Sequence, residues 1–357
     1  MKTSKFIKAI IVLIVLFIVS CGHNYKVKTI IYADGTCQRI LIVIGDSIPD
    51  FFAKAYPIPI DSTWNLIVET DTTKNGDTIY IHKASKFFKS VAQLNLLYAN
   101  DTSLHKNIER TLTLNKRFRW FYSFLDYQET YPKLFDQPSL TSYLDSTQYN
   151  YVMLSDKEQK KYLKEHFDSI EAKQFDDEAE NGLNKCLEFT IINSCTDAIE
   201  KCAVNIEDWP ISNSEFTIKR DSIINLIDGE LDIFEDDDDI FDAIKRVFSI
   251  DSVLYQKLKS ENDFKIYTDK YTLWGDVFLG EEYLNSVFMP GLIIETNSIK
   301  VSDSNHVEWS VDWIKYFTDD YEMKVTSRII NIWAFWVSGG GILLLLIILR
   351  RFYKRNK

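Results

Sequence analysis

The stretch IINIWAFWVSGGGILLLLIIL at residues 329–349 decides how the rest of the chain is organised. It contains 21 residues without a charge, and the basic tail RRFYKRNK follows at 350–357. A helix of this length reaches about 31 Å, the thickness of the hydrocarbon core of a bilayer. Because basic residues stay in the cytoplasm, the sequence predicts a transmembrane helix over 329–349, a cytoplasmic tail over 350–357, and all preceding residues on the outer side.

The amino end is also directed to a membrane. Three lysines precede an apolar run at 9–19, and small residues follow it, which is the pattern of a signal peptide over 1–20. The segment IVSC at 18–21 resembles the bacterial lipobox, and this resemblance implies that Cys21 is acylated and becomes the new amino terminus. An uncleaved signal anchor is the alternative. Two anchors in one membrane predict a domain that lies close to the bilayer.

Composition limits the classes of partner. The chain has 357 residues, 46% of them hydrophobic, which is enough for one large core or two small ones. Eight of its 41 Lys and Arg residues lie in the signal segment and the tail, which leaves 33 against 52 acidic residues and a net charge of −19 outside. Nucleic acid and anionic headgroups both need a basic face, so neither is predicted as a partner.

The cysteines after Cys21 are predicted to be buried free thiols. They are Cys37, Cys186, Cys195 and Cys202. On a predicted helix over 183–204, Cys195 and Cys202 share one face about 10 Å apart, which is too far for a disulfide, and Cys186 projects to the opposite side. A bridge to Cys37 is the alternative.

Neither a metal nor a cofactor is predicted. Five scattered histidines without a Cys-x-x-Cys motif do not make a zinc pattern. The acidic run at 235–239 lacks the alternating ligands and the glycine of a calcium loop. We interpret it as carboxylates at the start of a helix, where the helix dipole favours them.

Strand patterns occur at both ends of the chain and helical patterns occur between them. Hairpins are predicted around Asp34-Gly35 and Asn75-Gly76, which supply the positive φ of tight turns. The expected strands are 26–33, 36–44, 64–69, 77–82, 291–300, 306–314 and 321–328, and the expected helices are 85–98, 156–170, 183–204, 221–231 and 237–260. The sequence therefore predicts an α+β protein: an antiparallel β-rich module from 21–131 and 286–328, with a helical insertion at 132–285.

One extended stretch at 108–131 is unusually aromatic. Its centre, RFRWFYSFL at 117–125, is apolar at alternating positions and between them. A strand that is apolar on both faces is buried on both faces. We therefore expect an ordinary central strand here, and the alternative is the wall of an apolar ligand pocket.

The two ends of the chain resemble a known family. The segments FMPG at 288–291, TNS at 296–298, VEW at 307–309 and TSR at 326–328 precede the apolar helix. This series resembles the end of the LppM-like bacterial lipoproteins. The opening hairpin and the stretch near Trp120 are similar to envelope lipoproteins of the Bacteroidetes type. The resemblance implies a role in the cell envelope and the binding of lipid-like ligands, and it carries over no ligand residue.

A serine esterase is the alternative function. The segment IVIGDS at 42–47 resembles the first block of the Gly-Asp-Ser hydrolases, and Asp303 to His306 matches their Asp-x-x-His spacing. The resemblance implies Ser47 as nucleophile, His306 as base and Asp303 as the group that orients it. Three facts oppose it: the Gly-x-Asn-Asp block is missing, Asp-Ser recurs elsewhere in the chain, and Asp303 lies in a predicted hairpin turn.

These observations together favour a protein without enzymatic activity. We expect a lipoprotein of the bacterial inner membrane, anchored at both ends, with its main domain in the periplasm. Its expected partners are the membrane and either an envelope protein or a lipid-like ligand.

Overall fold

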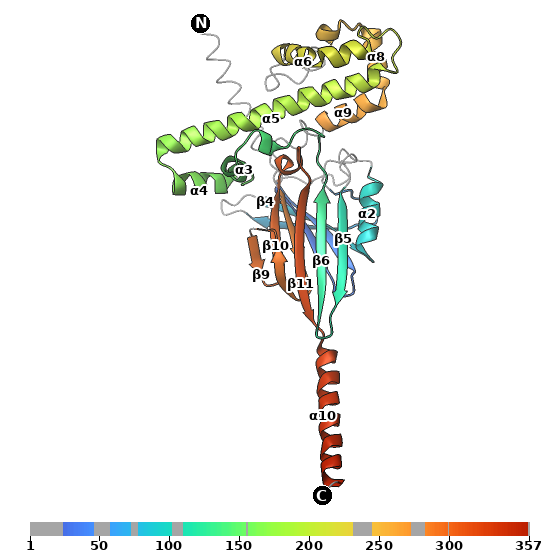
Figure 1. The fold of residues 1–357 in the computed structure, drawn as a ribbon, viewed down its shortest axis with the longest axis vertical. Helices are drawn as coiled ribbons and strands as arrows, with labels where there is room; N and C mark the ends of the chain where they lie inside the picture. The colour runs from blue at the N-terminus through green and yellow to red at the C-terminus, as the bar shows by residue number, and fades with distance from the viewer. Residues whose placement is uncertain are drawn as a thin grey trace.

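A computed structural model describes residues 24–45, 58–72, 78–101, 110–154, 156–230, 245–272, 283–298 and 300–355. Within these ranges the chain is a mixed α+β protein, as the sequence predicted. Two sheets pack against each other, a layer of helices covers one end of them, and a single helix projects from the other end (Figure 1). We call the two packed sheets the sandwich and the helices α3 to α9 the helical layer.

The larger sheet, sheet A, has seven strands in the order β3-β4-β2-β1-β7-β10-β9. The strands are β1 (Asn24–Ile31), β2 (Cys37–Gly45), β3 (Asn65–Thr72), β4 (Thr78–Phe88), β7 (Tyr283–Phe288), β9 (Lys300–Asp303) and β10 (His306–Val311). All neighbours are antiparallel except β1 and β7, which are parallel. Strands from the two ends of the chain therefore share one sheet.

The smaller sheet, sheet B, has the order β5-β6-β11-β8. Its strands are β5 (Thr111–Phe118), β6 (Tyr122–Tyr131), β8 (Leu292–Thr296) and β11 (Tyr321–Ile330). β6 and β11 pair along their whole length, from Tyr131 opposite Tyr321 to Tyr122 opposite Ile330. Helix α2 (Val91–Ala99) lies beside β5 (Figure 1).

The opening hairpin confirms the turn signal in the sequence. Gly35 has a φ of 93°, and the amide of Tyr32 donates to the carbonyl of Thr36. The turn predicted before His306 is confirmed at Ser304 and Asn305. The expected strand 291–300 is wrong, because β8 pairs with β11 in sheet B and a separate strand, β9, pairs with β10 in sheet A. The tip of the hairpin of β3 and β4, at 73–77, lies outside the described residues.

The helical layer is organised around one long helix. α5 (Ser169–Ala203) has 35 residues, about 52 Å, and crosses the end of the sandwich (Figure 1). The other helices are α3 (Ser146–Val152), α4 (Asp156–His166), α6 (Asn213–Glu230), α8 (Ser252–Ser260) and α9 (Asn262–Thr272). The predicted helix 156–170 is in fact two helices, because Asp168 caps α5 with hydrogen bonds from the amides of Ile170 and Glu171.

The other helix predictions are also wrong in their bounds. The expected helix 183–204 is only the second part of α5, which begins at Ser169, and the expected helix 221–231 is only the end of α6, which begins at Asn213. The expected helix 85–98 begins only after Ser90, which caps α2. Phe87 is 57% exposed and Phe88 is buried, so these two residues alternate across β4 with the period of a strand. The expected helix 237–260 is interrupted at Ser249, whose φ is 51°, and Asp251 caps α8. Residues 231–244, which include the acidic run, lie outside the described residues.

The apolar helix at the carboxyl end is α10 (Ile332–Arg355). Among the described residues it is the one helix long and apolar enough to cross a membrane. It begins three residues later than predicted, because Ile329 and Ile330 continue β11. Only Asn331 separates the strand from the helix, so sheet B leads almost directly into α10.

Candidate functional site

The junction between sheet B and α10 is built from the tip of the hairpin of β5 and β6. Asn331 donates through Nδ2 to the carbonyl of Arg119 at 2.8 Å, and its own amide donates to the carbonyl of Phe121 at 2.9 Å. The indole Nε1 of Trp120 donates to Oγ of Ser338 at 2.8 Å. These bonds fix the hairpin tip to the first two turns of α10.

Aromatic rings pack across the same junction. Phe118 stacks on Trp333 with ring centres 6.2 Å apart, Trp120 meets the same ring edge-on at 5.2 Å, and Phe121 lies 4.7 Å from Phe335. The sequence predicted that this stretch is a strand buried on both faces. That prediction is wrong, because Arg119 to Phe121 form a hairpin turn and Trp120 is 46% exposed. It is not the wall of a ligand pocket either, since its rings lie against α10.

A buried ion pair joins the two sheets inside the sandwich. Arg39 on β2 and Glu129 on β6 are both fully buried, with Nη2 2.7 Å from Oε1. Glu129 also accepts from the hydroxyl of Tyr127 at 2.9 Å and from Nδ2 of Asn285 at 3.0 Å. Burial raises the pKa of Glu129, and it is the largest single influence. The attraction of Arg39 and Arg110, together with the hydrogen bonds from Arg39 and Asn285, outweighs burial and lowers the pKa below the ordinary value. The pair is shielded from solvent, so we interpret it as structural.

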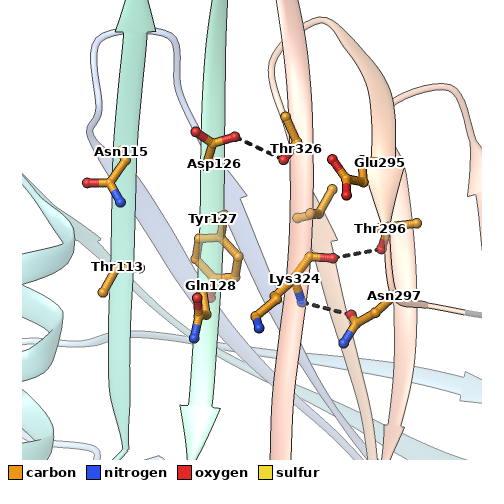
Figure 2. Close-up of a pocket in the computed structure, with 11 residues that line it drawn as sticks. Thr113, Asn115, Asp126, Tyr127, Gln128, Glu295, Thr296, Asn297, Lys324 and Thr326 are labelled. Atoms are coloured by element: carbon orange, nitrogen blue, oxygen red, sulfur yellow. Dashed lines mark hydrogen bonds between the residues drawn. The ribbon is translucent and has the colours of Figure 1, made fainter.

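Figure 2 shows a pocket on the outer face of sheet B, with a volume of about 260 Å³. Most of its side chains are polar, and several bond to one another: Thr326 donates to Asp126 at 2.9 Å, and Asn297 accepts from the amide of Lys324 at 2.8 Å. Asp126 is also paired with Arg117 at 2.6 Å. The pocket is open and polar, which is unlike the enclosed apolar cavity that holds a lipid.

A second hollow lies between α5 and α6 in the helical layer. It has a volume of about 670 Å³, and its lining combines the apolar side chains of Phe189, Ile192 and Ile224 with the charged groups of Glu188 and Arg220. Apolar centres with charged rims are typical of surfaces that bind proteins.

The residues of the esterase hypothesis are described only in part. Ser47 lies outside the described residues. Asp303 and His306 are paired where β9 meets β10, in the hairpin that the sequence predicted. The ring of His306 stacks on Phe288 at 4.0 Å, and its Nε2 lies 3.5 Å from a carboxylate oxygen of Glu308. Burial lowers the pKa of His306.

The four described cysteines are free and buried, as predicted. Cys195 packs in the main core, whereas Cys186 packs in a separate cluster with Leu144 and Tyr151, which confirms that the two thiols lie on opposite sides of α5. Burial raises the pKa of Cys195 to about 12 and that of Cys186 to about 11. Such thiols are unreactive. Among the described residues no group of three metal-ligating side chains occurs.

The amino end of the sandwich lies far from α10. Tyr283 begins β7 beside β1, and its hydroxyl is 2.6 Å from that of Tyr131, at the end of β6 opposite the hairpin tip. Asn24 is therefore close to the helical layer, and β11 spans about 30 Å between that level and α10. Cys21 lies outside the described residues.

Comparisons with protein-family models, curated proteins and solved structures found no match. The likeness to the LppM-like lipoproteins therefore stays a prediction from the two ends of the chain.

Proposed function

We propose that this chain is a membrane-anchored protein of the bacterial envelope, without enzymatic activity, that binds a partner protein through its helical layer. In this proposal α10 spans the inner membrane, the sandwich stands in the periplasm and the basic tail is cytoplasmic. The single observation that supports it most is the arrangement of the two ends. β11 continues into α10 after one residue, and the helical layer lies at the opposite end (Figure 1).

The physical argument rests on stiffness. A strand that leads directly into a membrane helix, with the hairpin tip bonded to both, leaves little freedom between the domain and the bilayer. A rigid stalk of this kind holds whatever is at its far end at a fixed height. The hollow between α5 and α6 gives that end a mixed apolar and charged surface suited to a protein partner. The open polar pocket on sheet B gives less support to a lipid-like ligand.

Placement is tested with single cysteines in spheroplasts. Ile218→Cys, on an α6 side chain that is 82% exposed, should react with a membrane-impermeant maleimide in intact spheroplasts. Phe352→Cys, 62% exposed in the last turns of α10 after the uncharged part 332–349, should react only after the membrane is opened. In a Cys21→Ala background, the four remaining native thiols are buried and give a low background. Labelling of position 352 but not of position 218 in intact spheroplasts would overturn the proposal.

The binding role needs a separate test in cells. A photo-crosslinking residue at Phe189, in the hollow of the helical layer, should give one adduct of defined mass, and the same residue at Thr113 on the outer face of sheet B should not. No adduct from position 189, or equal adducts from both positions, would contradict a partner at the helical layer. Acylation of Cys21 remains part of the proposal and is tested by labelling with a palmitate analogue, which Cys21→Ala should abolish.

A further inference from the structure

The end of the sandwich that meets α10 exposes large apolar side chains from several strands. Phe118 is 57% exposed, and Leu292, which is paired with Arg328 at the same end of sheet B, is 45% exposed. The exposed members of this collar are Phe118, Trp120, Phe121, Leu292 and Ile330. Exposed apolar side chains gathered at one end of a soluble domain mark an interaction site.

Basic side chains lie among these rings. Arg117 is paired with Asp126, and the guanidinium of Arg328 lies 4.8 Å from the ring centre of Tyr122. Arg119, at the hairpin tip, is exposed, and its side chain makes no hydrogen bond or ion pair within the described part of the chain. The excess of acidic residues in the outer region as a whole is therefore not found at the end of the sandwich that meets α10.

The length of α10 determines how deep this collar lies in a membrane. Its uncharged part, 332–349, has 18 residues and spans about 27 Å, slightly less than the roughly 30 Å of a hydrocarbon core. The helix must therefore enter the bilayer from its first residue. Trp120 is bonded to Ser338, six residues into the helix, about 9 Å along the axis. A bilayer that α10 crosses thus also surrounds the hairpin tip.

We propose that the tip of the hairpin of β5 and β6 is a second membrane contact, which inserts Phe118 and Phe121 at the headgroup level and Trp120 just below it, and which binds an anionic lipid phosphate through Arg119. This rests on the proposed function, because α10 must span the membrane. Aromatic rings favour the interface, and a guanidinium matches the oxygens of a phosphate. The indole nitrogen of Trp120 already has a partner in Ser338, so its insertion leaves no donor unsatisfied. The contact holds the sandwich upright.

The test uses the full chain in lipid nanodiscs, in a Cys21→Ala background, with a nitroxide on one introduced cysteine. A label at Phe121→Cys should collide more often with oxygen than with a water-soluble nickel complex. A matched label at Ile218→Cys on α6 should show the reverse. If Phe121→Cys is as open to nickel as Ile218→Cys while Leu345→Cys on α10 reports lipid, the insertion is overturned and the membrane anchor stands. If Leu345→Cys also reports water, the proposed function fails instead.

The binding of an anionic lipid phosphate by Arg119 is tested by comparing bilayers of different charge. In nanodiscs rich in phosphatidylglycerol, the label at position 121 should lie deeper than in nanodiscs of phosphatidylcholine alone. Arg119→Gln should remove that difference, whereas Lys164→Gln, which changes an exposed lysine on α4, should leave it. A depth that does not depend on lipid charge, or a dependence that survives Arg119→Gln, overturns the role of Arg119.

Discussion

The sandwich and the helical layer are held together by different interactions. The sandwich contains the ion pair of Arg39 and Glu129, in which both side chains are fully buried. The corresponding charged cluster of the helical layer joins Arg220 of α6 to Asp197 and Glu200 of α5, and its side chains are 25–38% exposed. One pair lies between two sheets and the other at the surface between two helices.

This difference indicates how far each region can change its geometry when a partner binds. A buried pair with several donors has one satisfactory geometry, so it fixes the position of sheet A on sheet B. Water can replace a partly exposed ion pair at little cost in free energy, so α6 can move on α5 without a large loss of stability. The rigid region is joined to α10 and the adaptable one lies at the far end, which suits a stalk that presents a binding layer.

The largest expected effect comes from breaking the buried pair. Glu129→Ala leaves the Arg39 guanidinium buried without a counter-charge, and the free energy of unfolding should fall by about 3–5 kcal/mol. Chemical denaturation in detergent measures the loss. The control is Glu200→Ala in the helical layer, which should cost about 1 kcal/mol or less. Equal losses for the two variants would remove the distinction between the regions.

Two glycines give a second comparison. A Cβ at Gly291, where φ is 85°, would overlap the carbonyl of Arg328, which is backbone of β11. A Cβ at Gly182 on α5 would meet the side chain of Leu144 and, at 2.9 Å, the carbonyl of Tyr143. Backbone in a sheet moves aside less easily than the end of a leucine side chain. Gly291→Ala should therefore lower the free energy of unfolding by about 2–3 kcal/mol and Gly182→Ala by about 1–2 kcal/mol.

Thermal unfolding of both glycine variants, followed by circular dichroism, measures the order of the two effects. If Gly182→Ala were the more destabilising change, the contact of α5 with Tyr143 and Leu144 would be more rigid than the contact of Gly291 with β11. The helical layer could not then be described as the adaptable region.

A smaller effect is expected for Arg220→Ala. Its guanidinium bonds Glu200 at 2.6 Å and also Asp197, but all three side chains reach solvent. The loss in stability should therefore stay within about 1 kcal/mol. The same variant should raise hydrogen exchange in α6 without changing exchange in β6 or β11. Raised exchange in those strands would show that the helical layer also stabilises the sandwich.

Local signals in the sequence predicted those parts of the fold that depend on local chemistry. Asp34-Gly35 marks the first hairpin because glycine accepts the positive φ found at Gly35. The uncharged stretch before the basic tail predicted an apolar helix, and the spacing of Cys195 and Cys202 predicted separate thiols.

The predictions that were wrong concern parts of the fold that depend on contacts between segments distant in the sequence. The turn at Arg119 to Phe121 contains no glycine, proline or asparagine, and it is stabilised by Asn331, 212 positions from Arg119. The alternation of side chains along β6 places position 129 on the buried face, between Tyr127 and Tyr131. A glutamate argues against burial at this position unless its counter-charge is known, and Arg39 comes from a distant strand. The candidate membrane contact was missed for the same reason, because its rings were interpreted without α10 beside them.

The smallest expected effect is a pH dependence confined to the sandwich. Burial lowers the pKa of both His82 and His306, which lie in sheet A. The folded chain therefore binds fewer protons than the unfolded chain once the pH falls below about 6.5, so stability decreases from there down through the folded pKa values. Carboxylates such as Glu129, whose pKa is already below 4.5, lose their contribution only at lower pH. The melting temperature should thus fall between pH 7 and pH 5.5. Replacing both histidines by Gln should flatten that slope, whereas an unchanged slope would assign it to groups outside sheet A.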